Sequence, residues 1–169
     1  MTKAELRNWA KAERKKLDME KISSVLRNKL VKTPEYINAK NIMIFYPLEN
    51  EINLLPLLKD STKNFYLPRI NGEDLDCCSY KEGDALSESR FHTKEPVCKA
   101  CDKTKTDMVV VPALMCDKNN YRLGYGGGFY DRFLRDYKGK KIVCIPKELI
   151  TETVYPETFD VKMDLIIYD

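Results

Sequence analysis

The sequence predicts an α/β fold, in which a layered sheet is covered by helices on both of its faces. Segments with helical periodicity alternate along the 169 residues with short runs of apolar residues that have the length of strands. These runs lack the alternation of apolar and polar residues that marks a sheet with one face in water, so both faces are expected to be buried. No linker or internal repeat divides the chain, and residues 1–169 are expected to form a single domain.

Amphipathic helices are predicted at several places. Thr2 and Glu5 have the spacing of a capping box, so the first helix begins there and runs to about Leu17. The second helix has apolar residues at i, i+3, i+4 and i+8, namely Ile22, Val25, Leu26 and Leu30. A short helix is expected over residues 52–58, and another begins near Gly128. The apolar face of that last helix consists of Tyr130, Phe133, Leu134 and Tyr137.

Strands are predicted over residues 41–46, 65–67, 75–80, 108–111, 142–145 and 165–168. The run from Met108 to Val111 is the clearest, because it is rich in β-branched residues and is bounded by Asp107 and Pro112. The stretch 81–106 is polar and predicts a long surface loop or a flap over a site.

The composition excludes several classes of protein. The 29 basic and 26 acidic side chains give a net charge of only +3, which argues against a dedicated nucleic-acid binder. No apolar run approaches the roughly 20 residues of a membrane-spanning helix. The N-terminus lacks the apolar core of a signal peptide, so we expect a cytoplasmic protein with no membrane partner. His92 is the only histidine, which excludes HExxH proteases and histidine-rich metal sites.

The six cysteines are expected to be reduced thiols in that compartment. Cys98 and Cys101 have CxxC spacing, which is typical of half a zinc site or of a redox pair. The second half of a zinc site is missing, and the surrounding residues predict a loop rather than the strand-to-helix turn of a thioredoxin-like pair. A zinc- or thiol-based regulatory module on these two residues is therefore kept only as a minor hypothesis.

Residues 117–131 are the most informative segment, because they contain four of the seven glycines and lead into the last helix. Glycines let backbone amides turn toward an anion, so this segment predicts a phosphate cradle. It is not a Walker A loop, and Phe129 stands where a dinucleotide fingerprint needs glycine or alanine. The alternative is a glycine-rich turn that binds no ligand.

Several charged residues have two interpretations. Asp131 either pairs with Arg135 in the helix or binds magnesium beside phosphates. Asp160 and Asp164 precede the last strand and are candidates to approach the same site. A basic stripe follows the first helix and consists of Lys3, Arg7, Lys11 and Arg14. We expect Lys11 and Arg14 to be solvated, whereas Lys3 and Arg7, one turn apart, are candidates for phosphate binding.

Candidate residues for a second ligand lie at the end of the first predicted strand and in the last predicted helix. Glu51 lies at its carboxyl end, where ligands gather in α/β sheets, and either holds a polar heterocycle or caps a helix. Tyr46 and Tyr130 are candidates to stack on a flat ring, although tyrosines are often core residues.

These segments together resemble a known family. Val111-Pro112 and the run from Arg122 to Leu134, Arg-Leu-Gly-Tyr-Gly-Gly-Gly-Phe-Tyr-Asp-Arg-Phe-Leu, strongly resemble 5-formyltetrahydrofolate cyclo-ligase, also called methenyltetrahydrofolate synthetase. The resemblance extends over nearly the whole chain. Its shorter matches, in order, are Lys3-x-x-Leu-Arg7, Tyr46-Pro-Leu-Glu-Asn-Glu51-Ile, Leu67-Pro68, Glu95-Pro96 and Phe159-Asp160.

The resemblance implies a cytosolic enzyme with a three-layer α/β/α fold and a mostly parallel sheet. It implies the ATP- and Mg²⁺-dependent conversion of 5-formyltetrahydrofolate to 5,10-methenyltetrahydrofolate, with release of ADP and phosphate, through a phosphorylated formyl intermediate. Its implied partners are these two small molecules alone, and the chain would be a monomer or a weak homodimer. A folate- or nucleotide-binding relative without catalysis is the alternative.

The resemblance also implies roles for particular residues. ATP would be bound by Lys3, Arg7, Arg122, Leu123, Gly124, Tyr125, Gly126, Gly127 and Gly128. Folate would be bound by Tyr46, Glu51 and Tyr130, and Mg²⁺ by Asp131 and Asp160. The catalytic residues would be Arg122, Tyr130 and Asp131.

The chain departs from the family pattern at three places. Asn120 stands where glycine is frequent, and Phe159 replaces a frequent histidine. The segment Cys144-Ile-Pro-Lys147 is unlike the family at that point, so contacts around residues 144–150 stay open.

Overall fold

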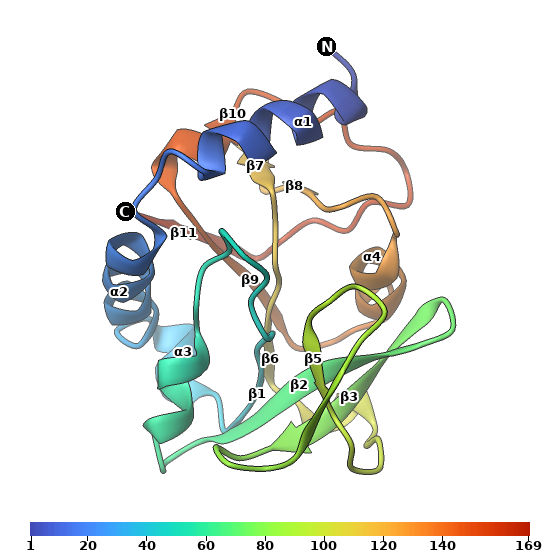
Figure 1. Cartoon of the computed structure of the whole chain (residues 1–169). Coiled ribbons are helices and arrows are strands. Elements are labelled where there is room, and N and C mark those ends of the chain that lie inside the picture. The colour runs from blue at the N-terminus through green and yellow to red at the C-terminus, as the bar shows by residue number, and fades with distance from the viewer.

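A six-stranded sheet forms the middle layer of the protein, and the computed structural model describes all residues, 1–169 (Figure 1). The strand order is β11-β9-β6-β1-β2-β3. The strands are β1 (Asn41–Met43), β2 (Asn64–Asn71), β3 (Asp74–Tyr80), β6 (Met108–Val110), β9 (Lys140–Ile145) and β11 (Leu165–Tyr168). All neighbours are parallel except β2 and β3, which form an antiparallel hairpin. The prediction of a mostly parallel sheet is thus confirmed.

Helices cover both faces of this sheet. Successive residues of β6 enter different cores: Met108 and Val110 belong to one cluster of buried side chains, and Val109 to the other. The first cluster includes side chains of α2 (Met19–Leu30) and α3 (Pro34–Asn38). The second includes side chains of α1 (Lys3–Arg14) and α4 (Phe129–Leu134). The predicted three-layer α/β/α architecture is therefore correct. The strands do not alternate apolar and polar residues because helices cover both faces of the sheet and exclude water from them.

Two smaller sheets were beyond sequence reasoning. One has the order β10-β7-β8 and consists of β7 (Met115–Asp117), β8 (Arg122–Leu123) and β10 (Ile150–Thr151). The other is a hairpin of β4 (Leu86–Glu88) and β5 (Lys94–Pro96), which lies inside the polar stretch 81–106. Strands of two or three residues are too short to show a periodicity. The single-turn elements η1 (Leu55–Lys59), η2 (Lys103–Lys105) and η3 (Lys147–Leu149) are 3₁₀-helices.

Some element boundaries differ from prediction. β2 continues through Pro68 to Asn71, although a strand end was expected at Pro68. Strand β1 pairs with β2 only as far as Tyr66. At Pro68, β2 therefore has only β3 as a neighbour. The N–H that proline lacks would have had no strand partner on the β1 side, so the strand can continue through Pro68. Helix α4 ends at Leu134, and Tyr137 joins the same core from the turn that follows.

Asp117 joins the β7–β8 turn to the segment that precedes β11. Its buried carboxylate accepts hydrogen bonds from the backbone amides of Asn119 (2.9 Å), Tyr121 (3.0 Å) and Val154 (3.1 Å). Asn120, between the first two, has a φ of 68°, a left-handed conformation that asparagine tolerates better than most residues. Glycine is thus not required there.

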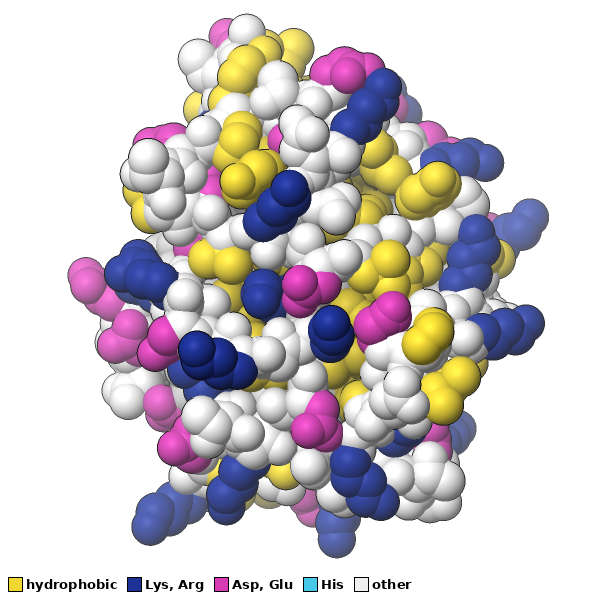
Figure 2. All heavy atoms as spheres, turned by 180° about the vertical axis from the view of Figure 1, so that it is seen from behind, with side chains coloured by type: hydrophobic (Ala, Val, Ile, Leu, Met, Phe, Trp, Pro, Cys, Tyr) yellow, Lys and Arg dark blue, Asp and Glu magenta, His cyan; other side chains and the backbone are white.

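Basic and acidic side chains are interspersed over the face shown in Figure 2, in line with the small net charge of +3. No helix is long and apolar enough to cross a membrane.

We predict that Asp117→Ala lowers the free energy of unfolding by about 2–4 kcal/mol, because buried amides lose their acceptor. Urea denaturation measures the change. Asp74→Ala is the matched control, since Asp74 is exposed, and it should change stability by less than about 0.5 kcal/mol. Equal stability of the two variants would contradict a structural role for Asp117.

Candidate active site

A cavity of about 720 Å³ lies at the carboxyl ends of β1 and β6. Such edges of parallel sheets are where ligands bind in α/β proteins. The cavity is lined by every predicted site residue: Lys3, Arg7, Tyr46, Glu51, Arg122, Leu123, Gly124, Tyr125, Gly126, Gly127, Gly128, Tyr130, Asp131 and Asp160. The fold therefore brings together residues from four separate parts of the sequence, while their individual roles stay predictions.

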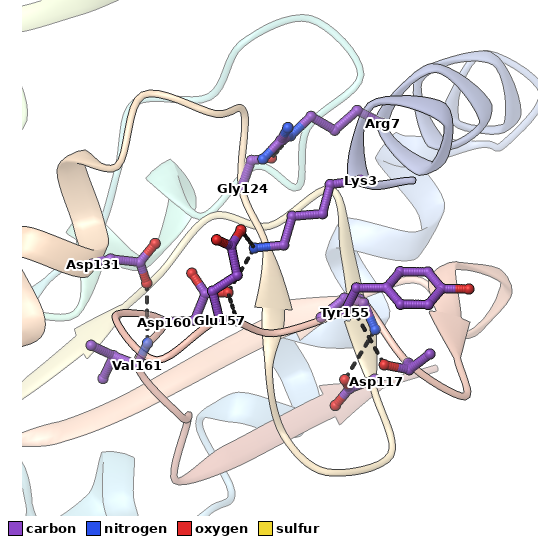
Figure 3. Close-up of polar contacts among 11 residues, drawn as sticks. Lys3, Arg7, Asp117, Gly124, Asp131, Tyr155, Glu157, Asp160 and Val161 are labelled. Atoms are coloured by element: carbon purple, nitrogen blue, oxygen red, sulfur yellow. Dashed lines mark hydrogen bonds and ion pairs between the residues drawn. The ribbon is translucent and has the colours of Figure 1, made fainter. Parts of the chain in front are cut away.

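Helix α1 reaches this cavity with two cations, as Figure 3 shows. The Lys3 Nζ atom lies 2.8 Å from Asp160 Oδ2 and 3.0 Å from Glu157 Oε1. Burial disfavours the charged form of Lys3, but hydrogen bonds to these two carboxylates outweigh it, and the pKa of Lys3 is raised. One turn along the helix, Arg7 Nε donates to the carbonyl of Gly124 at 2.9 Å.

Arg14, on the same stripe, corrects a prediction. It was expected to be solvated, but only 3% of its surface is exposed. Its guanidinium donates to the carbonyl oxygens of Asn50 (2.9 Å), Leu114 (3.2 Å) and Ala113. Burial lowers the pKa of Arg14 from its ordinary value. Helix α1 is thereby tied to the turn that carries Glu51 and to the chain that leaves β6. Lys11 is exposed, as predicted.

Glu51 is a buried carboxylate at one end of the cavity. Its Oε1 accepts the backbone amide of Leu48 at 2.6 Å, and its Oε2 accepts the hydroxyl of Tyr125 at 3.2 Å. Burial raises the pKa of Glu51, opposed by these two donors and by the charge of Arg14. A buried carboxylate with both oxygens oriented is suited to binding N–H donors of a ligand.

Residues 124–128, here called the glycine loop, expose their backbone to the cavity. None of their amide N–H groups has a hydrogen-bond partner within the protein. Gly126 and Gly128 have φ values of 107° and 72°, which favour glycine. A Cβ atom on Gly124 would lie 2.7 Å from Arg122 Nη1, so that guanidinium could not keep its position beside a larger residue.

Arg122 lies under the glycine loop and is almost fully buried. Its Nη1 donates to the carbonyl of Pro112 at 3.1 Å, and its guanidinium carbon lies 5.5 Å from the centre of the Tyr130 ring. The Nε of Arg122 is buried and has no partner. Buried donors without an acceptor are rare in native proteins, and Arg14 Nε on α1 is another. Burial also raises the pKa of Tyr130, which keeps its phenol neutral.

Asp131 and Asp160 line the cavity on the side of Lys3 (Figure 3). Asp131 Oδ1 accepts the amide of Val161 at 3.2 Å, and Asp160 Oδ2 accepts the amide of Glu157 at 2.8 Å. No group of three or more His, Cys, Asp or Glu residues is arranged to hold a metal by itself. Asp164, the other candidate, instead accepts the amide of Lys141 and does not line the cavity.

The β4–β5 hairpin provides cavity residues that sequence reasoning missed. It contributes Phe91, Thr93, Lys94 and Glu95 to the lining, so the stretch 81–106 is part of the site. Phe91 meets Phe129 edge-on with ring centres 5.9 Å apart, and the Thr93 hydroxyl donates to the carbonyl of Tyr46. The only feature of the sequence that could have marked the hairpin as part of the site is Phe91, an aromatic residue within a polar stretch. Residues 144–150 do not line the cavity.

The two cysteines of the CxxC spacing do not face one another. Cys98 Sγ contacts the carbonyl of Ser79, whereas Cys101 Sγ lies 3.9 Å from Cys77 Sγ. No metal-binding group includes either residue. The structure therefore gives no support to a zinc site on Cys98 and Cys101.

Comparison with known proteins gives one family. A family model described as the 5-formyltetrahydrofolate cyclo-ligase family matches residues 1–169. The 5-formyltetrahydrofolate cyclo-ligase of Haemophilus influenzae is 30% identical over 120 residues, which cover 66% of this chain and 64% of that protein. The mouse protein of the same name is 25% identical over 166 residues, covering 87% of this chain and 82% of its own.

Two solved structures are similar as well. The 5,10-methenyltetrahydrofolate synthetase of Aquifex aeolicus matches with a TM-score of 0.88 and 27% identity, over 99% of this chain and 90% of that one. A protein from Mycoplasma pneumoniae with the same enzyme name has a TM-score of 0.80 at 23% identity, over 99% and 98% of the two chains, and shows the shared fold.

We predict that Glu51→Gln alters the pH dependence of stability. A carboxyl pKa above its ordinary value of 4.5 means that folding favours the protonated form. The contribution of Glu51 to the free energy of unfolding is therefore largest below that pH and is lost as pH rises through the folded pKa. Urea denaturation should show the stability of the wild type falling relative to Glu51→Gln as pH rises above the ordinary carboxyl value of 4.5.

The exposed neighbour Glu49 supplies the control, because Glu49→Gln should leave the pH profile of stability unchanged. A wild-type stability that rises relative to Glu51→Gln as pH increases would contradict the raised pKa.

Proposed function

Because the chain belongs to the 5-formyltetrahydrofolate cyclo-ligase family, we propose that it converts 5-formyltetrahydrofolate and ATP to 5,10-methenyltetrahydrofolate, ADP and phosphate. The observation that carries the proposal is one cavity with two chemically different ends. The phosphate end consists of Lys3, Arg7, Arg122, the glycine loop, Asp131 and Asp160. The folate end consists of Tyr46, Glu51 and Tyr130.

The phosphate end is suited to a triphosphate. The unpartnered amides of the glycine loop supply hydrogen-bond donors, and Lys3 and Arg7 supply positive charge from α1. The buried Nε of Arg122 supplies a further donor that the protein itself does not satisfy. Backbone amides and guanidinium groups of this kind bind phosphate oxygens strongly.

The folate end is suited to a pterin ring. The carboxylate of Glu51 can accept N–H donors from the ring, and Tyr46 and Tyr130 are aromatic residues of the same cavity. Apolar side chains complete this end, among them Phe45, Leu48, Pro68, Ile70 and Leu75. The hairpin residue Phe91 closes the side next to α4.

Magnesium is the metal that the donor set fits. Mg²⁺ is usually held by one or two carboxylates, with substrate phosphates and waters as its other ligands. Asp131 and Asp160 provide two carboxylates beside the phosphate end, and one oxygen of each is outside the hydrogen bonds described above. We propose that these two residues hold the ion, which would neutralise charge on the triphosphate.

The proposed chemistry needs alignment more than a protein nucleophile. The formyl oxygen of the substrate attacks the γ-phosphorus and ADP leaves, which gives an iminium phosphate on N5. N10 then attacks the activated carbon, loses its proton, and closes the ring as phosphate departs. Lys3, Arg7 and Arg122 would hold the transferring phosphoryl group, and positioning of this kind supplies most of the catalysis in phosphoryl transfer.

Tyr130 would act as a hydrogen-bond donor in this reaction. Burial raises the pKa of its phenol, and the nearby carboxylate of Glu51 raises it further. The ring is stacked near the guanidinium of Arg122, which joins the two ends of the cavity. A neutral phenol at this point can donate to an oxygen of either substrate without acting as a base.

The test of this function is the methenyl absorbance band of the product. Purified protein with 5-formyltetrahydrofolate, ATP and Mg²⁺ should produce the band, and omission of ATP or protein should abolish it. Binding of both ligands without any product would instead identify a binding-only relative.

We predict that Asp131→Asn lowers kcat by about 100-fold or more while the protein stays folded, because a charged group at the transferring phosphate is lost. The reduction should lessen as the Mg²⁺ concentration is raised. Asp136→Asn is the matched control, since Asp136 is an exposed carboxylate five residues further along the chain that pairs with Lys103. Wild-type kcat in Asp131→Asn would remove this residue from the metal site.

We predict that Arg122→Ala weakens the binding of a non-hydrolysable ATP analogue by roughly 10- to 100-fold, because charged hydrogen bonds to phosphate are lost. Folate binding should weaken less. Calorimetric titration of each ligand measures both changes, with Arg135→Ala as a control at an exposed arginine. Equal losses for the two ligands would contradict the assignment of Arg122 to phosphate.

A further inference from the structure

Tyr125 belongs to the glycine loop, but its side chain is directed to the folate end of the cavity. Its hydroxyl donates to Glu51 Oε2 at 3.2 Å, although the two residues are 74 positions apart. This is the only hydrogen bond between the glycine loop and the turn 47–51. The phenol therefore joins a backbone segment suited to phosphates with a carboxylate suited to a pterin.

The orientation of Glu51 depends on this contact. Its other oxygen is fixed by the amide of Leu48 at 2.6 Å, so the plane of the carboxylate is set by one backbone donor and one phenol. A carboxylate has about four acceptor positions, and these two bonds leave the remainder for a ligand. Movement of the Tyr125 hydroxyl would change the direction in which those positions face.

The position of Tyr125 in turn depends on the glycine loop. The loop amides have no partners in the protein, and Arg7 Nε to the carbonyl of Gly124 is the one side-chain hydrogen bond to its backbone. Glycines at three consecutive positions, Gly126 to Gly128, give this backbone many accessible conformations. A triphosphate that accepts hydrogen bonds from the loop amides would restrict the loop to fewer of them.

We propose that Tyr125 is a positioning residue that couples the two substrate sites, so that binding of either substrate strengthens binding of the other. The inference rests on the proposed function, because it needs a nucleotide at the glycine loop and a folate at Glu51. A nucleotide that orders the loop holds the Tyr125 hydroxyl on Glu51 and prepares the carboxylate for folate. Folate bound to Glu51 in turn holds Tyr125 and orders the glycine loop for the nucleotide. Because coupling is reciprocal, each ligand raises the affinity for the other by the same factor.

The experiment measures this coupling directly. Calorimetric titration gives the Kd of 5-formyltetrahydrofolate with and without a saturating non-hydrolysable ATP analogue and Mg²⁺. The wild type should bind folate about fivefold or more tightly with the analogue present. In Tyr125→Phe, which removes only the hydroxyl, the ratio of the two Kd values should fall below about twofold. The reverse titration should give the same ratio for the analogue.

Tyr121→Phe is the matched control, because Tyr121 lies four residues earlier, outside the cavity, and its hydroxyl makes no hydrogen bond. It should keep the wild-type ratio. A wild-type ratio near one, or an unchanged ratio in Tyr125→Phe, would overturn the coupling while methenyl product formation by the wild type still supports the proposed function. Absence of product together with failure to bind one of the ligands would overturn both.

Discussion

The basic face of α1 is the constraint on which the rest of the site depends. Lys3, Arg7 and Arg14 lie on this face and reach three different parts of the chain: the carboxylates before β11, the glycine loop, and the turns that follow β1 and β6. Strand pairing joins two of these parts, where Leu114 and Met115 pair with Leu123 just before the glycine loop, and α1 contacts all of them. The loops above the carboxyl edge of the sheet thus have α1 as their common partner.

The division of the core into two layers explains how α1 can contact the loops around the cavity. The buried side chains on the face covered by α2 and α3 are mostly apolar. The opposite face carries α1, α4 and the small β10-β7-β8 sheet. Residues of α1, α4 and β8 line the cavity together with residues of β2, β3 and the β4–β5 hairpin. Leu6, Ala10 and the buried Arg14 fix α1 on the core. Lys3 and Arg7 of the same helix reach the loops around the cavity.

Sequence reasoning found the layers and the site because both depend on long or specific patterns. The unalternating strands predicted burial on two faces, and the glycine-rich run marked the phosphate end. Sequence reasoning did not predict that Arg14 is buried. Helical spacing places this residue on a charged stripe, but it cannot show that the guanidinium donates to three backbone carbonyl groups from distant parts of the chain. It also missed the β4–β5 hairpin, whose three-residue strands are polar and whose contacts with the cavity come from far along the chain.

The contacts of α1 also set when the cavity can form. Lys3 meets Asp160 across 157 positions, and Arg7 meets Gly124 across 117. During synthesis the helix therefore leaves the ribosome long before its partners exist, with three basic groups lacking acceptors. Contacts of such separation are made late, because the chain between them must first be ordered. The layered core is thus expected to assemble ahead of the cavity, and a chain shortened before residue 157 would keep much of the sheet without a complete site.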